Sequence, residues 1–276
     1  MRRHELSDAE WEFVRPLLPE LLRGRKRLDD RRVLNGIVWK FQTGTAWRDV
    51  PERYGPWATL HTRFHGWAAD GTFDGMLRVA QAKAGAAGSI DWLVSVNPTV
   101  VRAHQHAAGA RKGGLCEPAL GRSRGGLASK VHLACDGSGR PLGFVVTGGN
   151  TNDCTRPITV VETIRVPRLG PGRPRTRPDR VLGDKGYSSK AIRTWLRRRG
   201  IPHTIPERAD QVRNRSRRGS RGGRPPAFDR EAYTHRNVVE RCFHRLKQWR
   251  GIATRYDKTA ESYKAAVTLA SLLTWA

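Results

Sequence analysis

The densest set of side chains that could do chemistry lies in one segment, YTHRNVVERCFHRLKQWRG, residues 233 to 251. If this segment is one helix, at about 100° per residue, five polar side chains fall within one narrow stripe. They are Tyr233, Arg236, Glu240, His244 and Lys247. An isolated helix with an ordinary ion pair between Arg236 and Glu240 would be the simpler interpretation. The alternative is that Glu240 stands among cations on a functional face.

A second acid favours the functional interpretation. Asp184 ends a short apolar strand in RVLGDKGY, and open α/β sheets present their sites at the carboxyl ends of their strands. A strand-end aspartate, a helix-borne glutamate and many arginines predict a pocket for hard divalent cations and phosphates. Cleavage of a phosphodiester with two metal ions calls for a third carboxylate, which the neighbouring strand should supply at its own end.

That neighbouring strand is predicted to run from Trp92 and to stop at Asn97-Pro98. An amide therefore stands where a carboxylate is expected, and because it carries no charge it ligates Mg²⁺ far more weakly. Asp91 is a poor substitute, since it lies about six residues or roughly 20 Å away along the strand. Asp153 is a better one, although it can also be an ordinary acid at a helix start.

The spacing Tyr-x2-Arg-x3-Glu-x6-Lys in YTHRNVVERCFHRLK resembles the signature of bacterial insertion-sequence transposases of the DDE type. LGDKGYSS is similar to the second-aspartate region of that family, and GRSRGGLASKVHLACDGSGRPLGFVVTGGNTND is similar to its strand pair. TAWRDVPERYGPWATLHTRFHGW resembles the domain found ahead of that core. The resemblance covers nearly the whole chain.

This resemblance implies a ribonuclease-H-like core with Asp184 as the second catalytic acid and Glu240 as the third, both binding Mg²⁺ or Mn²⁺. The residues implied to support the site or hold DNA are Tyr233, Arg236 and Lys247. The first acid should be an Asp at position 97, followed by a small hydroxyl residue. Asn97-Pro98 departs from that pattern at two adjacent positions, which favours drift in a decayed or repurposed copy over deliberate inactivation.

The implied function is that of a transposase, which binds the terminal inverted repeats of its element and the target, both double-stranded DNA, and cleaves and transfers strands. A homodimer or higher homo-oligomer is expected, because two ends must be paired, and the expected location is the bacterial cytoplasm, at the nucleoid. The alternative is a non-catalytic DNA-binding protein that acts as a repressor or competitor. A third hypothesis, an arginine-rich RNA-binding protein, has no RNA-recognition motif to support it.

Composition agrees with a polyanionic partner. The 276 residues include 51 Lys and Arg against 25 Asp and Glu, a net charge of +26, and cations on a protein bind phosphates by releasing condensed counterions. A basic surface that only keeps the protein soluble is the alternative. The four cysteines show no paired C-x-x-C spacing and are predicted to be reduced. No apolar run approaches the 18 or so residues of a membrane span, so a soluble intracellular protein is expected.

The elements that must position these residues divide the chain in two. Residues 1–86 are predicted to form a small all-helical domain, opened by a capping box of Ser7 and Glu10, with basic faces that could bind DNA. Residues 90–276 are predicted to be α/β, a mixed sheet flanked by helices.

Two segments, 165–180 and 208–226, are rich in Arg, Gly and Pro and are predicted to be solvated loops. The arginines of the second loop that are predicted to contact phosphates are Arg213, Arg215, Arg217 and Arg218.

Overall fold

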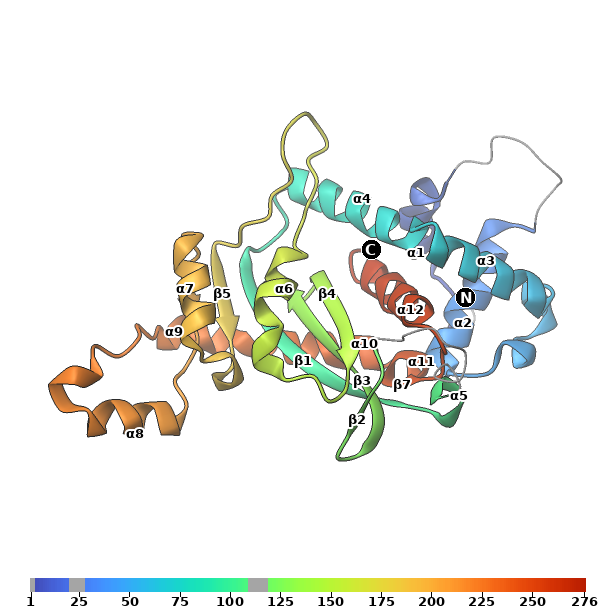
Figure 1. The fold of residues 1–276 in the computed structure, drawn as a ribbon. Coiled ribbons are helices and arrows are strands. Elements are labelled where there is room, and N and C mark those ends of the chain that lie inside the picture. The colour runs from blue at the N-terminus through green and yellow to red at the C-terminus, as the bar shows by residue number, and fades with distance from the viewer. Residues whose placement is uncertain (1–2, 20–27, 109–118) are drawn as a thin grey trace.

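The computed structural model describes residues 3–19, 28–108 and 119–276. Its first part is helical (Figure 1), with α1 (Asp8–Val14), α2 (Asp30–Thr43), α3 (Trp57–Ala69), α4 (Thr72–Ala86) and 3-10 turns at Arg15–Leu17, Trp47–Asp49 and Glu52–Tyr54. The predicted capping box is present, because the Ser7 hydroxyl accepts from the Glu10 amide and the Glu10 carboxylate accepts from the Ser7 amide. The predicted helical N-terminal region is confirmed.

A sheet and its covering helices follow. The strands are β1 (Leu93–Ala103), β2 (Gly121–Ser123), β3 (Gly126–Cys135), β4 (Pro141–Gly148), β5 (Arg180–Gly183), β6 (His203–Thr204) and β7 (Thr254–Arg255). The helices are α5 (Gln105–Ala108), α6 (Pro157–Glu162), α7 (Lys190–Arg198), α8 (Ala209–Arg217), α9 (Arg230–Thr234), α10 (Val238–Lys247), α11 (Arg250–Ala253) and α12 (Ala260–Leu273). The 3-10 turns are Asp153–Thr155, Lys185–Tyr187, Gly219–Gly222 and His235–Asn237.

The sheet is mixed and β1 lies at its centre. The strand order is β2-β3-β1-β5-β6, with β4 also paired to β3 and β7 to β1. β1 runs antiparallel to β3 and parallel to β5. Helix α10 packs on β1 and β3, while α6 packs on β3 and β4. The predicted mixed sheet flanked by helices is confirmed.

The prediction that the first strand stops at Asn97-Pro98 was wrong, because β1 continues to Ala103. Pro98 lies opposite His132 of β3 in the antiparallel pair. Along the other edge of β1, β5 pairs only with the first four residues and β7 pairs only with the last two. Proline has no N–H to donate, and this gap between β5 and β7 is where a strand tolerates it.

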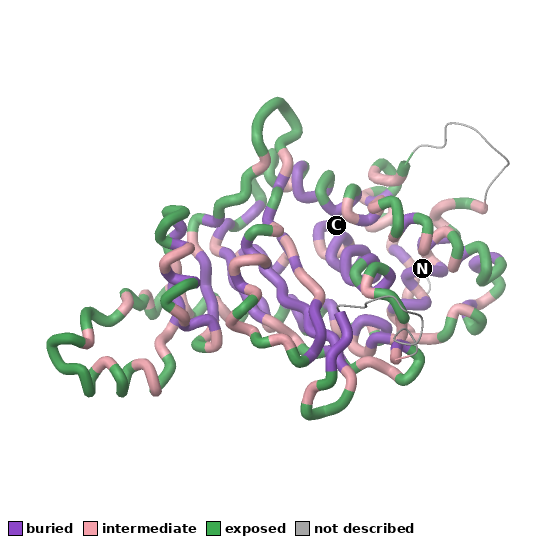
Figure 2. Tube along the Cα trace, viewed as in Figure 1, coloured by how far each residue is buried: buried purple, intermediate pink, exposed green. Residues whose placement is uncertain are grey.

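One predicted loop and one predicted helix also need correction. The segment 208–226 is not a loop throughout, because α8 is a helix that projects from the body of the molecule with most of its surface exposed (Figure 2). The segment 233–251 is not one helix, because the 3-10 turn His235–Asn237 separates α9 from α10. The earlier segment, 165–180, carries little regular structure beyond one isolated bridge between Val166 and Arg175 until β5 begins at its end.

One hydrophobic core runs through both parts of the chain. Phe41 and Phe64 of the N-terminal helices belong to the same cluster of buried residues as Ala266 and Leu269 of α12. Helix α12 packs along α4 (Figure 1). The division into 1–86 and 90–276 stays a prediction, and the shared core means that each part covers apolar surface of the other.

The described residues include no helix that is both long and apolar enough to cross a membrane. Cys135, Cys154 and Cys242 are free thiols, and Cys116 lies outside the described residues.

Candidate active site

Asn97 lies in the middle of β1, on the face of the sheet that α10 covers. Alternation along a strand puts Asn97, Thr99 and Val101 on one face, and Val101 is buried in a cluster with Val239 and Phe243 of α10. The Asn97 side chain is buried, with 9% of the residue exposed. An uncharged amide therefore occupies this position beneath the helix.

Asp184 is the first residue after β5, because the strand ends at Gly183, one position before the end predicted from the sequence. The parallel register aligns Val96 of β1 with Gly183 of β5, so Asn97 and Asp184 follow at adjacent positions of neighbouring strands. Strand alternation turns both side chains toward the same face. The Asp184 carboxylate accepts a hydrogen bond from the Gly186 amide at 2.8 Å, which fixes it at the start of a 3-10 turn.

Glu240 lies in the first turn of α10 and contacts Asn97 directly. The Asn97 Nδ2 donates to Glu240 Oε1 at 2.8 Å, and Arg236 Nη1 lies 3.5 Å from the same oxygen. The apolar face of α10, with Cys242 and Leu246, packs on the sheet and so fixes the position of Glu240 relative to β1. The structure thus brings Asn97 and Glu240 together, with Asp184 at the next register position.

The hydrogen bond from Asn97 and the nearby Arg236 satisfy Glu240 without a metal ion. A carboxylate at position 97 would face Glu240 with like charge, and both could stay ionised only with positive charge between them. Asp184, Glu240 and Asn97 offer two carboxylates and one amide carbonyl, which are oxygen ligands of the kind that Mg²⁺ and Mn²⁺ prefer. A site with three acids would offer three anionic ligands, whereas this one offers two. Within the described residues, no group of three or more His, Cys, Asp or Glu could hold a metal ion.

Lys247, at the end of α10, is bound to β1. Its Nζ donates to Thr99 Oγ1 at 2.7 Å and to the Val100 carbonyl at 3.1 Å. Partial burial lowers the pKa of Lys247, and the nearby Glu240 charge opposes that shift. Sequence reasoning missed Thr99, although its place two residues after Asn97 on the same strand face was a usable signal.

Tyr233 and Arg236 precede α10, and Arg236 pairs with Glu240. The Tyr233 ring is 5.1 Å from the Phe228 ring, and the Arg236 guanidinium is 5.9 Å from the Tyr233 centroid. His244 is exposed on α10. The 3-10 turn between α9 and α10 therefore interrupts the predicted stripe but keeps Arg236 close to Glu240.

Asp153 does not replace the missing acid. Its carboxylate accepts from Lys130 Nζ at 2.7 Å. Lys130 lies on β3 one residue before Val131, which packs under α10, so alternation places Lys130 on the opposite face. Asp91 is exposed and accepts from the Leu93 amide, away from Glu240.

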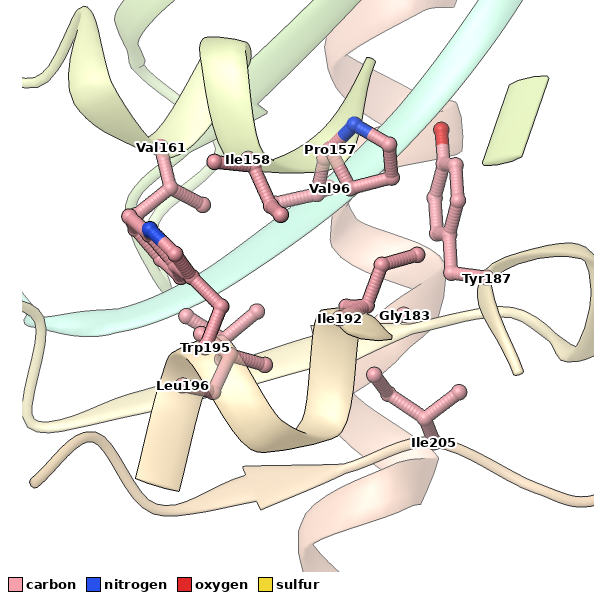
Figure 3. A pocket seen from close by; sticks show the side chains of 11 residues that line it. Val96, Pro157, Ile158, Val161, Gly183, Tyr187, Ile192, Trp195, Leu196 and Ile205 are labelled. Carbon is pink, nitrogen blue, oxygen red and sulfur yellow. The ribbon is translucent and has the colours of Figure 1, made fainter. Parts of the chain in front are cut away.

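A small apolar hollow lies on the α6 side of the sheet, behind the two strand positions that precede Asn97 and Asp184 (Figure 3). Val96 and Gly183 line it, together with Ile158 of α6 and Trp195 of α7. Tyr187 also lines it, and burial followed by the Asp184 charge raises the pKa of this tyrosine. Sequence reasoning missed Tyr187, which packs beneath the turn that carries Asp184.

The four arginines predicted to contact phosphates lie on or beside α8. Arg213, Arg217 and Arg218 are exposed, whereas Arg215 forms an ion pair with Glu207 at the base of the helix. Ser188 donates to Gln211 Oε1 at 2.6 Å, so the start of α8 is attached next to the turn that follows Asp184.

Two family models match the chain. The model "Transposase DDE domain" matches residues 89–275, and "Putative transposase of IS4/5 family" matches residues 6–77. "Uncharacterized protein y4sN" of Sinorhizobium fredii (strain NBRC 101917 / NGR234) is 39% identical over 109 residues, which cover 39% of this chain and 83% of that protein. No solved structure shows a significant match.

Two relatives carry transposase names. "Putative transposase for insertion sequence element IS402" of Burkholderia cepacia is 34% identical over 145 residues, covering 52% of this chain and 61% of that protein. "Putative transposase for insertion sequence element IS6501" of Brucella ovis (strain ATCC 25840 / 63/290 / NCTC 10512) is 26% identical over 149 residues, covering 54% of this chain and 98% of that protein. The DDE model spans β1, β5 and α10, the elements that carry Asn97, Asp184 and Glu240. The chain therefore belongs to the DDE-domain transposases of the IS4/5 family of insertion sequences.

Proposed function

We propose that this transposase binds the terminal inverted repeats of its own insertion sequence and retains the frame of a metal-dependent strand-cleavage centre that Asn97 has weakened. The observation that carries the proposal is the hydrogen bond from Asn97 to Glu240, beside Asp184. It pairs the position expected to hold the first acid with the residue expected to be the third. We also propose that the protein acts as a homodimer or higher homo-oligomer and that it is located in the bacterial cytoplasm, at the nucleoid.

Charge supports the DNA-binding part. The net charge of +26 favours association with phosphates at any sequence. Helix α8, which carries exposed arginines, projects from the body of the molecule (Figure 2) and begins beside the turn that follows Asp184. DNA held at the site would pass close to them, and Arg213, Arg217 and Arg218 are the ones free to contact phosphate oxygens.

The cleavage part assigns roles to three oxygen-bearing side chains. Asp184 and Glu240 would hold Mg²⁺ or Mn²⁺, and the Asn97 carbonyl would add a neutral oxygen if its amide group turned. A bound divalent cation would activate the attacking water or 3′ hydroxyl and stabilise charge on the leaving oxygen. Arg236 offsets part of the Glu240 charge, and Lys247, which is tied to Thr99, contributes positive charge near a scissile phosphate.

The second candidate is a non-catalytic DNA-binding protein that occupies the ends as a repressor or competitor. The same Asn97–Glu240 hydrogen bond favours it, because this bond lets the site persist without a metal ion. Both candidates predict DNA binding, and they differ in whether cleavage can be restored.

The test is strand cleavage of duplex DNA that carries the element's ends, by the wild-type chain and by Asn97→Asp, with and without Pro98→Ser. The wild type should bind the ends and cleave poorly. The Asp variant should gain cleavage in Mg²⁺ or Mn²⁺ by on the order of a hundredfold, since each 1.4 kcal/mol of restored stabilisation is a factor of ten in rate. Adding Asp184→Asn or Glu240→Gln should abolish that gain and leave binding intact.

Robust cleavage by the wild type that does not need Asp184 would overturn the assignment of the site. A folded, DNA-binding Asp variant with no metal-dependent gain would favour the non-catalytic protein.

A further inference from the structure

A basic groove lies at the open edge of the sheet, apart from the candidate active site. β6 is the last strand in the order and has no neighbour beyond it in the described sheet. The groove runs along this edge between α7 and residues 224–227, where the chain returns from α8. Its charged and titratable lining residues are Arg180, Arg193, Arg197, Arg224 and His203.

Arg193 is the buried cation of this groove. The residue is 8% exposed, and its Nη2 donates to Ser188 Oγ at 3.1 Å and to the Ile205 carbonyl at 2.7 Å. Its Nη1 is buried and has no hydrogen-bond partner among the described residues. Arg193 lines the groove, and its two hydrogen bonds through Nη2 hold the guanidinium in place. It therefore adds a fixed positive charge beneath the exposed Arg197 and Arg224.

Nearby acids offset little of the groove's charge. Arg180 is neutralised by Asp229 at 2.6 Å. Glu207 acts electrostatically on Arg193, but Glu207 is itself paired with Arg215. In the part of the chain that the structure describes, three groove arginines form no ion pair with a carboxylate: Arg193, Arg197 and Arg224.

His203 lies in the field of these arginines. Burial lowers its pKa, and the charges of Arg193 and Arg197 lower it further, while a hydrogen bond to the Ile201 carbonyl opposes the shift. A phosphate bound beside it would favour the protonated imidazole. His203 is therefore a built-in reporter of anion binding.

We infer that this groove binds backbone phosphates of the DNA that flanks the cleavage centre, an inference that rests on the proposed function. β5 connects the two places, with Arg180 at the groove and Asp184 just past its other end. At the rise of a strand, these four residues span about 13 Å. A DNA strand advances about 3.4 Å per nucleotide, so phosphates about four nucleotides from the scissile bond can reach the groove.

The test compares two double variants of the full chain with the same change in charge. Arg197→Glu with Arg224→Glu reverses two exposed groove arginines and leaves the buried Arg193 in place. Arg198→Glu with Arg78→Glu reverses two exposed arginines that do not line the groove, and is the matched control. Affinity for duplex DNA is measured against salt concentration, and the His203 pKa by NMR with and without inorganic phosphate or duplex.

The groove variant should lower the slope of log K against log salt by up to about 1.8 relative to the wild type, about 0.9 per lost phosphate contact. At 0.1 M salt this corresponds to a loss of affinity of ten- to a hundredfold. Duplex should raise the His203 pKa in the wild type and the control, and not in the groove variant. Phosphate-contact interference should place the protected phosphates about four nucleotides from the cleavage position.

An equal loss of affinity in both double variants would overturn the inference and leave the proposed function standing. In a second outcome, the chain binds no duplex DNA, but inorganic phosphate raises the His203 pKa in the wild type and not in the groove variant. That result would overturn both the proposed function and the assignment of the groove to DNA. In a third outcome, the chain binds duplex DNA, but the His203 pKa rises with inorganic phosphate and not with duplex. That result would assign the groove to free phosphate, contradict the inference and leave the proposed function standing.

Discussion

Two polar pairs join distant segments of this protein, and they are built differently. At the junction of α2 with the segment before α12, the Lys40 and Asp257 side chains are 3% and 7% exposed and 3.5 Å apart, with Lys40 3.8 Å from the Phe41 ring centroid. At the candidate site, Glu240 faces a neutral amide and its side chain is 39% exposed. One pair consists of two charges removed from water, and the other is a single charge that water can reach.

The difference separates structural from chemical use of charge. A buried ion pair is held by mutual attraction, and removing one partner leaves the other charged and unsolvated. The Glu240 carboxylate can exchange its partner for water or a ligand at little cost. The following predictions test this contrast.

The largest effect is expected at the junction. Lys40→Met should lower the free energy of unfolding by about 3–5 kcal/mol, because Asp257 keeps its charge inside the protein. Urea denaturation measures this change. Lys40→Met combined with Asp257→Asn should recover a large part of the loss, and a single variant that costs less than about 1 kcal/mol would contradict the contrast.

The next effect is a pH dependence from a buried histidine that forms no ion pair with any of the residues that the structure describes. His132 is fully buried, and burial lowers its pKa to about 4 from an ordinary value of 6.5, with the Asp153 charge opposing. Because the folded pKa is depressed, the unfolded chain binds the proton more readily. Its contribution to stability is complete above about pH 6.5 and declines as the pH falls toward 4, by up to about 3 kcal/mol.

Urea denaturation at pH 7 and at pH 4.5 should show this loss of unfolding free energy at low pH in the wild type. In His132→Gln the free energy of unfolding should depend less steeply on pH, by the equivalent of one bound proton. An unchanged pH dependence would show that other groups control acid unfolding.

A smaller effect is expected at the site itself. Glu240→Gln should change the free energy of unfolding by no more than about 1 kcal/mol, since the new side-chain carbonyl can still accept from Asn97 and the position is partly exposed. Thermal unfolding compares it with Lys40→Met. A loss as large as that at the junction would mean that Glu240 serves the fold.

The smallest effect on stability is expected on α8. Replacing Arg213, Arg217 and Arg218 with Ala should leave the melting temperature unchanged, because these side chains are exposed. The slope of log K for DNA against log salt should fall by up to about 0.9 for each lost phosphate contact. Arg215→Ala is the contrasting variant, since it breaks the pair with Glu207; an unchanged slope in the triple variant would show that α8 does not contact the DNA backbone.

Local patterns in the sequence predicted much of the fold. The Ser7 capping box, which was predicted, depends on neighbouring residues only, and so does the all-helical pattern of the first part of the chain. The true length of β1 could not be predicted in this way, because Pro98 is tolerated only through a gap between two strands that are distant in sequence. The helix α8 was missed because its polar composition lacks an apolar face.

The candidate site shows the same division. Asp184 and Glu240 were predicted as site residues from a strand end and from helical spacing, and Asn97 from the neighbouring strand. Their relation was not predictable, since the contact from Asn97 to Glu240 joins residues 143 apart in the chain. The hydrogen bonds of Lys130 to Asp153 and of Lys247 to Thr99 also join residues that are distant in the sequence. Sequence patterns therefore could not show that these two lysines already have partners.

The most direct test of the central claim is the change in melting temperature that Mn²⁺ causes in Asn97→Asp compared with the wild type. The claim is that the Asn97 amide satisfies Glu240 in place of a metal ion. Without metal, the Asp variant should melt below the wild type, because two carboxylates then face each other. With Mn²⁺ it should regain that loss and more, since a ligand at a hundred times its Kd stabilises by about 2.7 kcal/mol, while the wild type shifts much less. Equal shifts in the two proteins, or a shift in the Asp variant that survives Asp184→Asn, would contradict the claim.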